Sequence, residues 1–106
     1  MAPEGRSIGL VETRGIVALT AGIEAMMKTA DVQTIAIERI SSGYLAAAVR
    51  GSLAAVRQAV AAGSKAVEEY GELRAAQVYP KPHGESAALL AGNGADRLAR
   101  AIEAAT

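Results

Sequence analysis

The sequence contains no cysteine, no phenylalanine and no tryptophan. The absence of cysteine excludes disulfides and thiolate chemistry. The formal net charge is zero, with 11 Lys and Arg against 11 Asp and Glu, so there is no basic field to attract nucleic acid or an anionic membrane. The longest apolar run is far shorter than the roughly 20 residues that cross a bilayer, and the first residues lack the apolar core of a signal peptide. We therefore expect a cytoplasmic protein with no nucleic-acid partner and no membrane contact.

Alanine supplies much of the apolar content. Hydrophobic residues make up 51% of the chain, while only three residues are aromatic, all of them tyrosines. Because an alanine side chain buries little surface, the core of this 106-residue chain is expected to be thin. Small domains with thin cores commonly gain stability by burying further surface in an oligomer. Length and composition thus predict a single domain, residues 1–106, that oligomerises.

Hydrophobic periodicity predicts six elements in the order β-α-β-β-α-β. Alternation of apolar residues favours strands, and spacing by three or four residues favours helices. The predicted elements are a strand at 7–13, a helix from 16 to about 31, strands at 33–40 and 44–50, a helix at 53–70 and a strand at 72–79. This order is typical of an α+β, ferredoxin-like fold with a four-stranded antiparallel sheet and two helices on one face.

The strand at 44–50, YLAAAVR, has the weakest local support. Its alanine-rich centre has poor strand propensity, and the local signal suits a helix equally well. Its position after the small turn at 41–43 makes it the returning partner of the preceding strand. The prediction of a strand therefore rests on context.

Both helices carry signals at particular positions. The predicted apolar face of the first helix consists of Ile16, Leu19, Ile23, Met26, Met27 and Ala30. Ser52 is the expected N-cap of the second helix, and Gly71 is expected to end it. Gly63 falls on the apolar face of that helix, where the lack of a side chain lets another backbone approach closely.

The last strand is followed by Pro80 and Pro82, which cannot donate to a sheet ladder, so the core is expected to cover about residues 7–83. Residues 84–106 are predicted as a C-terminal helical extension, with a short helix at 85–91, a turn at 92–94 and a weakly amphipathic helix at 95–105. Leu98 and Ile102 lie four residues apart in this last helix. Their apolar stripe could pack on the subunit's own sheet or on a neighbouring subunit.

Few residues suggest catalysis. His83 is the only histidine, so a histidine metal cluster or a catalytic triad would have to be shared between subunits. Glu68 and Glu69 are adjacent on a helix and point apart, and no phosphate-binding glycine motif occurs. Lys28 ends the first helix, where a cation is favourable, and Lys81 lies between two prolines on a rigid turn. We expect no catalytic residue, no metal, no cofactor and no enzymatic activity.

Five segments in register carry a family resemblance. They are GLVETRG at 9–15, AMMKTA at 25–30, ERISSG at 38–43, VRG at 49–51 and YPKPH at 79–83. Together they resemble the bacterial microcompartment (BMC) shell proteins of the single-domain hexameric type, from about Ser7 to His83. The resemblance implies a structural protein of wedge shape, six copies of which form a flat hexagonal tile. Such tiles pack edge to edge into the shell of a protein organelle in the cytoplasm.

In that family the turn after the second strand lines a central pore. The resemblance gives this role to Ser41, Ser42 and Gly43, with Arg39 where a lysine commonly flanks the opening. Ser42 stands at the pore-lining serine position. Ser41 stands where relatives often carry glycine, so its hydroxyl could narrow the rim or turn away. Such an opening favours small polar or anionic molecules, because hydroxyl and N–H groups replace part of the hydration they lose.

The resemblance also places four residues at the edge between tiles: Lys28, Asp31, Lys81 and His83. Lys28 matches a lysine that lies against its symmetry mate and donates to backbone carbonyls. Lys81 stands where many relatives carry arginine in a turn that inserts into the neighbouring tile, and an ammonium cannot reproduce a bidentate guanidinium. Asp31 stands where asparagine is frequent, and it could pair with a lysine or add repulsion.

The implied partners are the other copies in a homohexamer, neighbouring hexamers, other shell proteins of the same compartment and encapsulated enzymes that bind through targeting segments. A function of another class stays open at this point, namely a ferredoxin-like oligomer that senses or regulates by binding a small molecule between subunits. A dimer or trimer that forms no sheets would favour it. A third hypothesis, an enzyme that uses a carboxylate between subunits, has almost no residue support.

Overall fold

A computed structural model gives the fold and describes residues 6–80. Lys81, His83 and the predicted extension at 84–106 lie outside the described residues. The elements are β1 (Ser7–Arg14), α1 (Ile16–Thr29), β2 (Gln33–Arg39), β3 (Tyr44–Gly51), α2 (Leu53–Tyr70) and β4 (Glu72–Tyr79). Their order and type agree with the prediction, and the bounds differ only at the ends of elements.

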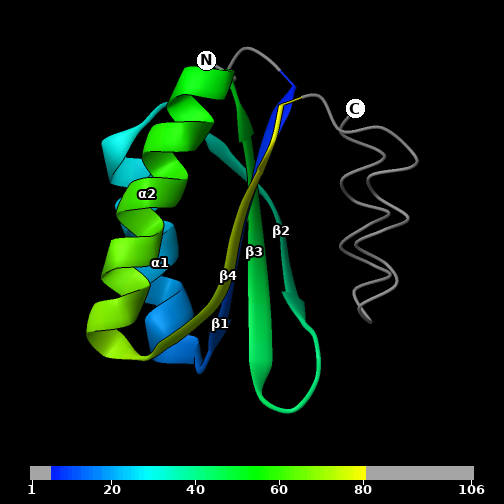
Figure 1. Ribbon diagram of the computed structural model, residues 1–106, viewed down its shortest axis with the longest axis vertical. Helices are drawn as coiled ribbons and strands as arrows, with labels where there is room; N and C mark the ends of the chain where they lie inside the picture. The colour runs from blue at the N-terminus through cyan, green and yellow to red at the C-terminus, as the bar shows by residue number, and fades with distance from the viewer. Residues whose placement is uncertain (1–5, 81–106) are drawn as a thin grey trace.

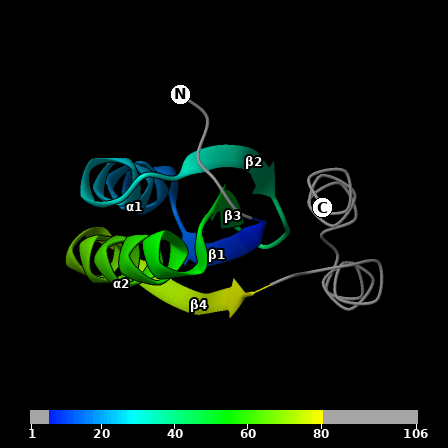
Figure 2. The ribbon, with the colours of Figure 1, turned by 90° about the horizontal axis from the view of Figure 1, so that it is seen from above.

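The four strands form one antiparallel sheet in the order β2-β3-β1-β4. Both helices lie on the same face of this sheet (Figures 1 and 2). In the central strand β1, Gly9 and Val11 face the helices, whereas Ile8 and Leu10 face the other side. The α+β, ferredoxin-like arrangement is therefore confirmed. Within residues 6–80, neither helix combines the length and the apolar character that crossing a membrane requires.

Strand β3 forms in spite of its alanines because of its place in the sheet. It is an inner strand, paired with β1 on one side and β2 on the other, so its backbone groups find partners along both edges. Ala46, Ala47 and Ala48 are completely buried. Ala47 faces the helices, whereas Ala46 and Ala48 face the other side of the sheet. Burial on both faces and pairing along both edges override the weak strand propensity of alanine.

The two helices approach each other at a pair of glycines. A Cβ atom on Gly63 would lie 2.6 Å from Cγ of Met26 and 3.3 Å from the carbonyl oxygen of Gly22. A Cβ atom on Gly22 would lie 2.7 Å from Cγ2 of Val67. The close approach predicted at Gly63 is thus confirmed, whereas the matching role of Gly22 was not predicted.

The predicted core face of α1 was wrong at two positions. Ile16 and Met27 are 63% and 46% exposed. The buried residues of α1 are Ala18, Leu19, Gly22 and Met26. The close contact with α2 sets this face, since Gly22 and Met26 of α1 pack against Val67 and Gly63 of α2. Ile16 and Met27 therefore point out of the subunit.

The ends of α2 agree with the prediction, with one physical difference. The Ala55 N–H donates to Oγ of Ser52 at 3.1 Å, which confirms the N-cap. Gly71 ends the helix, but its φ of 179° is extended backbone and not the left-handed conformation usual for glycine at this place. Glycine is needed there for space, since a Cβ atom would lie 2.9 Å from that of Ala18.

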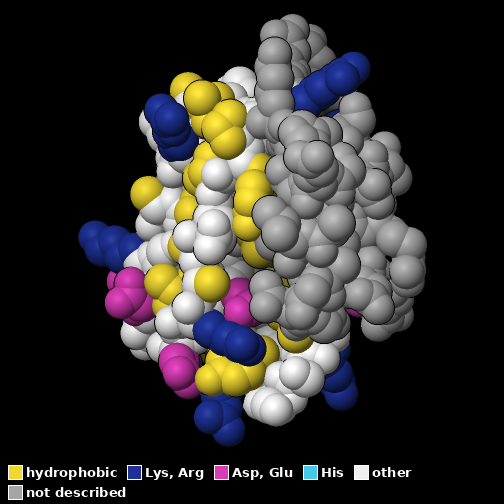
Figure 3. Space-filling model, turned by 45° about the vertical axis from the view of Figure 1, so that its right-hand side comes forward, with side chains coloured by type: hydrophobic (Ala, Val, Ile, Leu, Met, Phe, Trp, Pro, Cys, Tyr) yellow, Lys and Arg dark blue, Asp and Glu magenta, His cyan; other side chains and the backbone are white. Residues whose placement is uncertain are grey.

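Apolar side chains form a cluster on each face of the sheet. The larger cluster lies under the helices and includes Val11, Leu19, Met26, Val49, Val56 and Val67. The smaller one, called here the helix-free cluster, consists of Ile8, Leu10, Ala46 and Ala48, with Ile35, Ala36, Ile40 and Tyr79 packed against it. Apolar side chains also reach the surface of the described residues, as the yellow atoms in Figure 3 show.

Candidate functional site

The chain reverses between β2 and β3 in a three-residue loop, residues 41–43, which is closed by the facing residues Ile40 and Tyr44. The Tyr44 N–H donates to the carbonyl of Ser41 at 2.9 Å, and the Ile40 N–H donates to the carbonyl of Tyr44 at 2.9 Å. The central residues have positive φ, 55° at Ser42 and 83° at Gly43. Two positive values in succession are the pattern of a type I′ turn, whose twist matches that of the strands it joins. The three predicted pore residues thus form a tight and exposed hairpin end.

This turn is held against the start of α1. The Gly15 N–H donates to the carbonyl of Gly43 at 3.3 Å. Oγ1 of Thr13, a fully buried residue of β1, donates to the carbonyl of Gly15 at 3.3 Å. Hydrogen bonds through Gly15 therefore connect the exposed hairpin end to the inner strand β1 and fix its position relative to the sheet.

Positive charge gathers around the turn. The exposed Arg39 lines a shallow hollow of about 230 Å³ with Gly15, Ile16, Gly43 and Leu45. Nε of Arg14 lies 3.8 Å from the place that a Cβ atom on Gly43 would take. Helix α1 begins beside the turn without a side-chain cap or an acidic residue in its first turn, so its dipole adds to the positive field. Two arginines and the start of a helix therefore lie beside the turn.

A stack of side chains that was not predicted supports the base of the hairpin. The guanidinium carbon lies 4.4 Å from the Tyr44 ring centroid for Arg74 and 5.8 Å for Arg14. Nε of Arg74 is 3.1 Å from Oε2 of Glu12. The pairing of β1 with β4 shifts register between Glu12 and Thr13, and the bulge brings Arg74 to this place. No periodic pattern in the sequence marks such a bulge.

The predicted edge residues lie at the other end of α1. Nζ of the exposed Lys28 is 2.7 Å from Oε1 of Glu24, one helical turn earlier. The hydrogen bond, and after it the attraction of the charges, raises the pKa of Lys28 and lowers the pKa of Glu24. Asp31 is exposed in the link between α1 and β2. Since α1 has 14 residues, Lys28 lies about 20 Å from the turn beside its first residue.

The predicted site residues thus fall into two groups at opposite ends of α1. Arg39 lies with residues 41–43 at one end, and Lys28 lies with Asp31 at the other. Lys81 and His83 lie outside the described residues. In the described part of the chain, no group of three or more histidine, aspartate and glutamate residues could hold a metal ion.

Comparison with known families identifies the family to which the chain belongs. The family model described as the BMC domain matches residues 7–82. The chain belongs to the BMC domain family. The match begins at the first residue of β1 and extends past β4, so it includes both the turn at 41–43 and Lys28.

Curated members of the BMC domain family are similar over most of their length. The microcompartment shell protein EutM of Salmonella typhimurium is 42% identical over 79 residues, which are 74% of this chain and 82% of EutM. The shell protein PduA of Citrobacter freundii is 38% identical over 84 residues, 79% of this chain and 90% of PduA. The carboxysome shell protein CsoS1A of Hydrogenovibrio crunogenus is 40% identical over 86 residues, 80% of this chain and 90% of CsoS1A.

A solved structure shares the BMC fold. A microcompartments protein from Desulfitobacterium hafniense DCB matches 94% of this chain with a TM-score of 0.67 and 27% identity. The chain spans 48%, about half, of the length of that protein. The family resemblance inferred from the five sequence segments is confirmed by these matches.

Proposed function

We propose that the chain is a structural, non-enzymatic shell protein whose homohexamers form flat tiles of a bacterial microcompartment in the cytoplasm. Membership of the BMC domain family and the shell proteins among its relatives support the structural role. One geometric observation carries the proposal further, because the exposed turn at 41–43 and the exposed Lys28 lie at opposite ends of α1. Such a subunit can present the turn to a central axis and the lysine to the outer edge of a ring.

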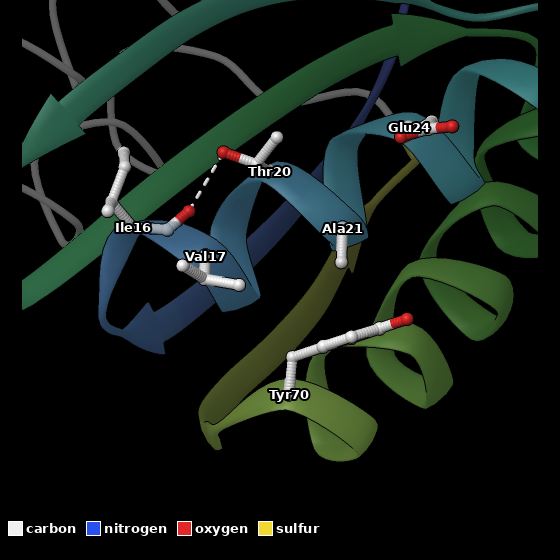
Figure 4. Close-up of a pocket in the computed structure, with 6 residues that line it drawn as sticks. All are labelled: Ile16, Val17, Thr20, Ala21, Glu24 and Tyr70. Carbon is white, nitrogen blue, oxygen red and sulfur yellow. Dashed lines mark hydrogen bonds between the residues drawn. The ribbon is translucent and has the colours of Figure 1, made fainter.

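Exposed apolar side chains near the turn support a contact between subunits. Ile16 and Val17 are each 63% exposed, and Tyr70 is 62% exposed. Figure 4 shows Val17, Ala21 and Tyr70 around a common hollow of about 330 Å³ between α1 and the end of α2. Burial of apolar surface stabilises association by about 25 cal/mol per Å². The head-to-tail contact that closes six copies into a ring would bury this group.

In this hexamer the turns of all six copies meet on the axis and line a pore. Ser41 and Ser42 supply hydroxyl groups, and Gly43 brings the backbone close to the opening. Small polar metabolites can exchange hydration water for hydrogen bonds from these groups, whereas apolar molecules gain no such compensation. Repeated copies of Arg39 and Arg14 near the rim favour the passage of anions through the pore.

Neighbouring tiles meet through Lys28 and Asp31, and through Lys81 and His83. An ammonium has three donors and Glu24 occupies one of them, so Lys28 keeps donors for carbonyl groups across the edge. Edge contacts of this kind repeat without limit and also admit other shell proteins of the compartment. Encapsulated enzymes bind the assembled shell through their targeting segments.

Native mass spectrometry and electron microscopy test the tile. At micromolar concentration we expect rings of six subunits, and at higher concentration extended sheets. A stable monomer would contradict the proposal. A dimer or trimer that forms no sheets would favour the alternative, an oligomer that binds a regulatory small molecule between subunits.

Substrate entry into shells assembled with this protein tests the pore. Ser42→His adds a bulky side chain of a type that tolerates positive φ. We expect it to slow the entry of a small anionic substrate while the tile still assembles. Ser42→Asn, which is smaller and also tolerates positive φ, is the matched control and should slow entry less. If the rate of substrate entry is unchanged in Ser42→His, the substrate does not enter through this pore.

A further inference from the structure

Tyr44 connects the loop at 41–43 to the rest of the sheet in two ways. Its N–H donates to the carbonyl of Ser41 and its carbonyl accepts from the N–H of Ile40, both at 2.9 Å, so its backbone closes the loop. Its ring receives the guanidinium group of Arg74, whose central carbon lies 4.4 Å from the ring centroid. The position of the ring and the position of the loop are therefore coupled through one residue.

Arg74 is held at both sides of its guanidinium group. A cation attracts an aromatic face within about 6 Å of the ring centroid, and Arg74 lies well inside this range of Tyr44. Nε of the same group is 3.1 Å from Oε2 of Glu12. Arg14, which lies opposite Tyr44 on β1, is farther from the ring, at 5.8 Å. Glu12 therefore orients the arginine that makes the closer contact with the ring.

The bulge between β1 and β4 allows this contact. Glu12 pairs with Ala75 and Thr13 pairs with Leu73, so Arg74 is the extra residue and has no partner of its own on β1. Strand β1 lies between β4 and β3 in the sheet. The contact of Arg74 with Tyr44 therefore crosses the central strand and connects the edge strand β4 to the hairpin.

The backbone connection of the loop to β1 is made of long hydrogen bonds. The Gly15 N–H donates to the carbonyl of Gly43 at 3.3 Å, and Oγ1 of Thr13 donates to the carbonyl of Gly15 at 3.3 Å. Both distances exceed the usual range of such bonds, so they hold the loop less firmly than the two shorter bonds at Tyr44. A side-chain contact at Tyr44 therefore adds an anchor where the loop is best connected.

We propose that Arg74, oriented by Glu12, is the positioning residue of the loop at 41–43 and thereby sets the size selectivity of the pore. This inference rests on the proposed function, because it requires that six copies of the loop line an opening. With Arg74 in contact with Tyr44 the loop keeps one position, and solutes larger than the opening are excluded. Without this contact the loop samples several positions, so exclusion by size weakens while the ring of subunits remains.

Hydrogen exchange measures the positioning of the loop in the full-length chain. Arg74→Gln should speed exchange of the Ile40 and Tyr44 amides about fivefold, because the opening of the hairpin no longer breaks a cation–π contact. Tyr44→Leu should have the same effect, whereas Tyr44→Phe keeps the aromatic face and should exchange like the parent. Arg57→Gln, at an exposed position on α2, is the matched control. The Val56 amide, which is bonded to the N-cap of α2, should be unaffected in every variant.

Two results of the exchange experiment would overturn the inference. The first is parent-like exchange of the Ile40 and Tyr44 amides in Arg74→Gln. The second is equal exchange in Tyr44→Phe and Tyr44→Leu, because the aromatic face would then have no part in holding the loop.

Entry of solutes into assembled shells measures selectivity, which a merely structural role would not change. Glycolate and gluconate are hydroxy-carboxylates of equal charge and different size. In Arg74→Gln shells the ratio of their entry rates should fall toward equality, while native mass spectrometry still shows rings of six subunits. Glu12→Gln should change the ratio in the same direction by a smaller amount. Arg74→Gln should have no further effect in a Tyr44→Leu background, because the two side chains act through one contact.

Ser42→His separates this inference from the pore proposal. If Ser42→His slows entry but Arg74→Gln leaves the ratio of glycolate to gluconate unchanged, Arg74 does not set selectivity and the pore proposal stands. If neither variant changes the entry of either solute, the pore proposal itself is contradicted and the inferred role of Arg74 in selectivity falls with it.

Discussion

Ser42 has a backbone conformation that most side chains avoid. Its φ of 55° is the only positive value at a residue other than glycine within residues 6–80. The left-handed conformation costs an L-residue roughly 1–2 kcal/mol, and asparagine tolerates it better than most. The twist of the hairpin imposes this conformation, since the exposed side chain of Ser42 is not constrained by burial.

Substitution of this serine should separate backbone strain from loss of the hydroxyl. Ser42→Val should lower the free energy of unfolding by about 1–2 kcal/mol, because a β-branched residue resists positive φ. Ser42→Asn should preserve it. Ser41→Val is the matched control and should change it by less than about 0.5 kcal/mol. Urea denaturation measures all three, and equal losses for the two valine variants would contradict the strained turn.

The ion pair of Lys28 with Glu24 predicts a pH dependence. The pKa of Glu24 is lowered from 4.5, so the pair is fully present above pH 4.5 and is lost as the pH falls through the lowered pKa. The pKa of Lys28 is raised from 10.5, so the pair is fully present below pH 10.5 and is lost as the pH rises through the raised pKa. NMR titration should show the pKa of Glu24 rising toward 4.5 in Lys28→Met, and not in the control Lys65→Met. An unchanged Glu24 pKa in Lys28→Met would contradict the pairing.

Lys28 also tests the proposed edge. Lys28→Ala should leave rings of six subunits intact and suppress sheets in electron micrographs, because the donors across the edge are gone. Glu24→Gln removes the partner within the helix and keeps the ammonium, so it should keep both rings and sheets. If Lys28→Ala assembles as well as the parent, the lysine has no role at the edge.

At the level of elements, α1 and α2 pack closely at two glycines, Gly22 and Gly63. Gly63→Ala gains about 1 kcal/mol of helix propensity but places a Cβ against Met26 and the Gly22 carbonyl, and such overpacking costs about 1–3 kcal/mol. These opposing effects should lower the free energy of unfolding by about 1 kcal/mol, which chemical denaturation measures.

A double-mutant cycle identifies the cause of this loss. Gly63→Ala should lower the free energy of unfolding by a smaller amount in a Met26→Ala background, because the side-chain atoms nearest the new Cβ are then absent. Ala61→Gly, on the exposed side of α2, should lower stability by about 1 kcal/mol through propensity alone. Strictly additive effects of Gly63→Ala and Met26→Ala would rule out the proposed steric conflict.

The elements also show how far local patterns predict this fold. Periodicity was sufficient to predict both helices and β1, β2 and β4, although β1 is buried on both of its faces. For β3 only the context was sufficient, because its alanines carry no strand preference and its burial depends on strands remote in sequence. The exposed Ile16 and Met27 were misplaced because the contact face of α1 is set by glycines on two helices.

The candidate site was predictable in part. The roles of the residues at the turn and at the edge were predicted from the order and spacing of short segments, and not from any local chemistry, and they stay predictions. The positive φ of Ser42 belongs to the turn type of residues 41–44, which the sequence did not settle. Arg74 was missed because it reaches Tyr44 through a bulge between strands that are distant in sequence.

For the whole molecule, the thin alanine-rich core and the exposed apolar group near the turn both favour association. Val17→Lys places a charge in the hollow beside Tyr70, so it should shift rings of six subunits toward smaller species while circular dichroism stays that of the folded chain. Gln58→Lys, at an exposed position on α2 outside this hollow, is the matched control. Native mass spectrometry measures the distribution, and rings that persist in Val17→Lys would place the subunit contact elsewhere.

The hairpin end at 41–43 is a short loop of three residues between the facing residues Ile40 and Tyr44. Its length fixes the pairing of Arg39 with Leu45, and one inserted residue would slip the register and exchange the two faces of β2. An opening built from such turns cannot be resized by lengthening the loop without disturbing the sheet. Selectivity for a different metabolite therefore has to come from amino-acid substitutions in the loop. At Ser42 only residues that accept a left-handed backbone conformation are suitable.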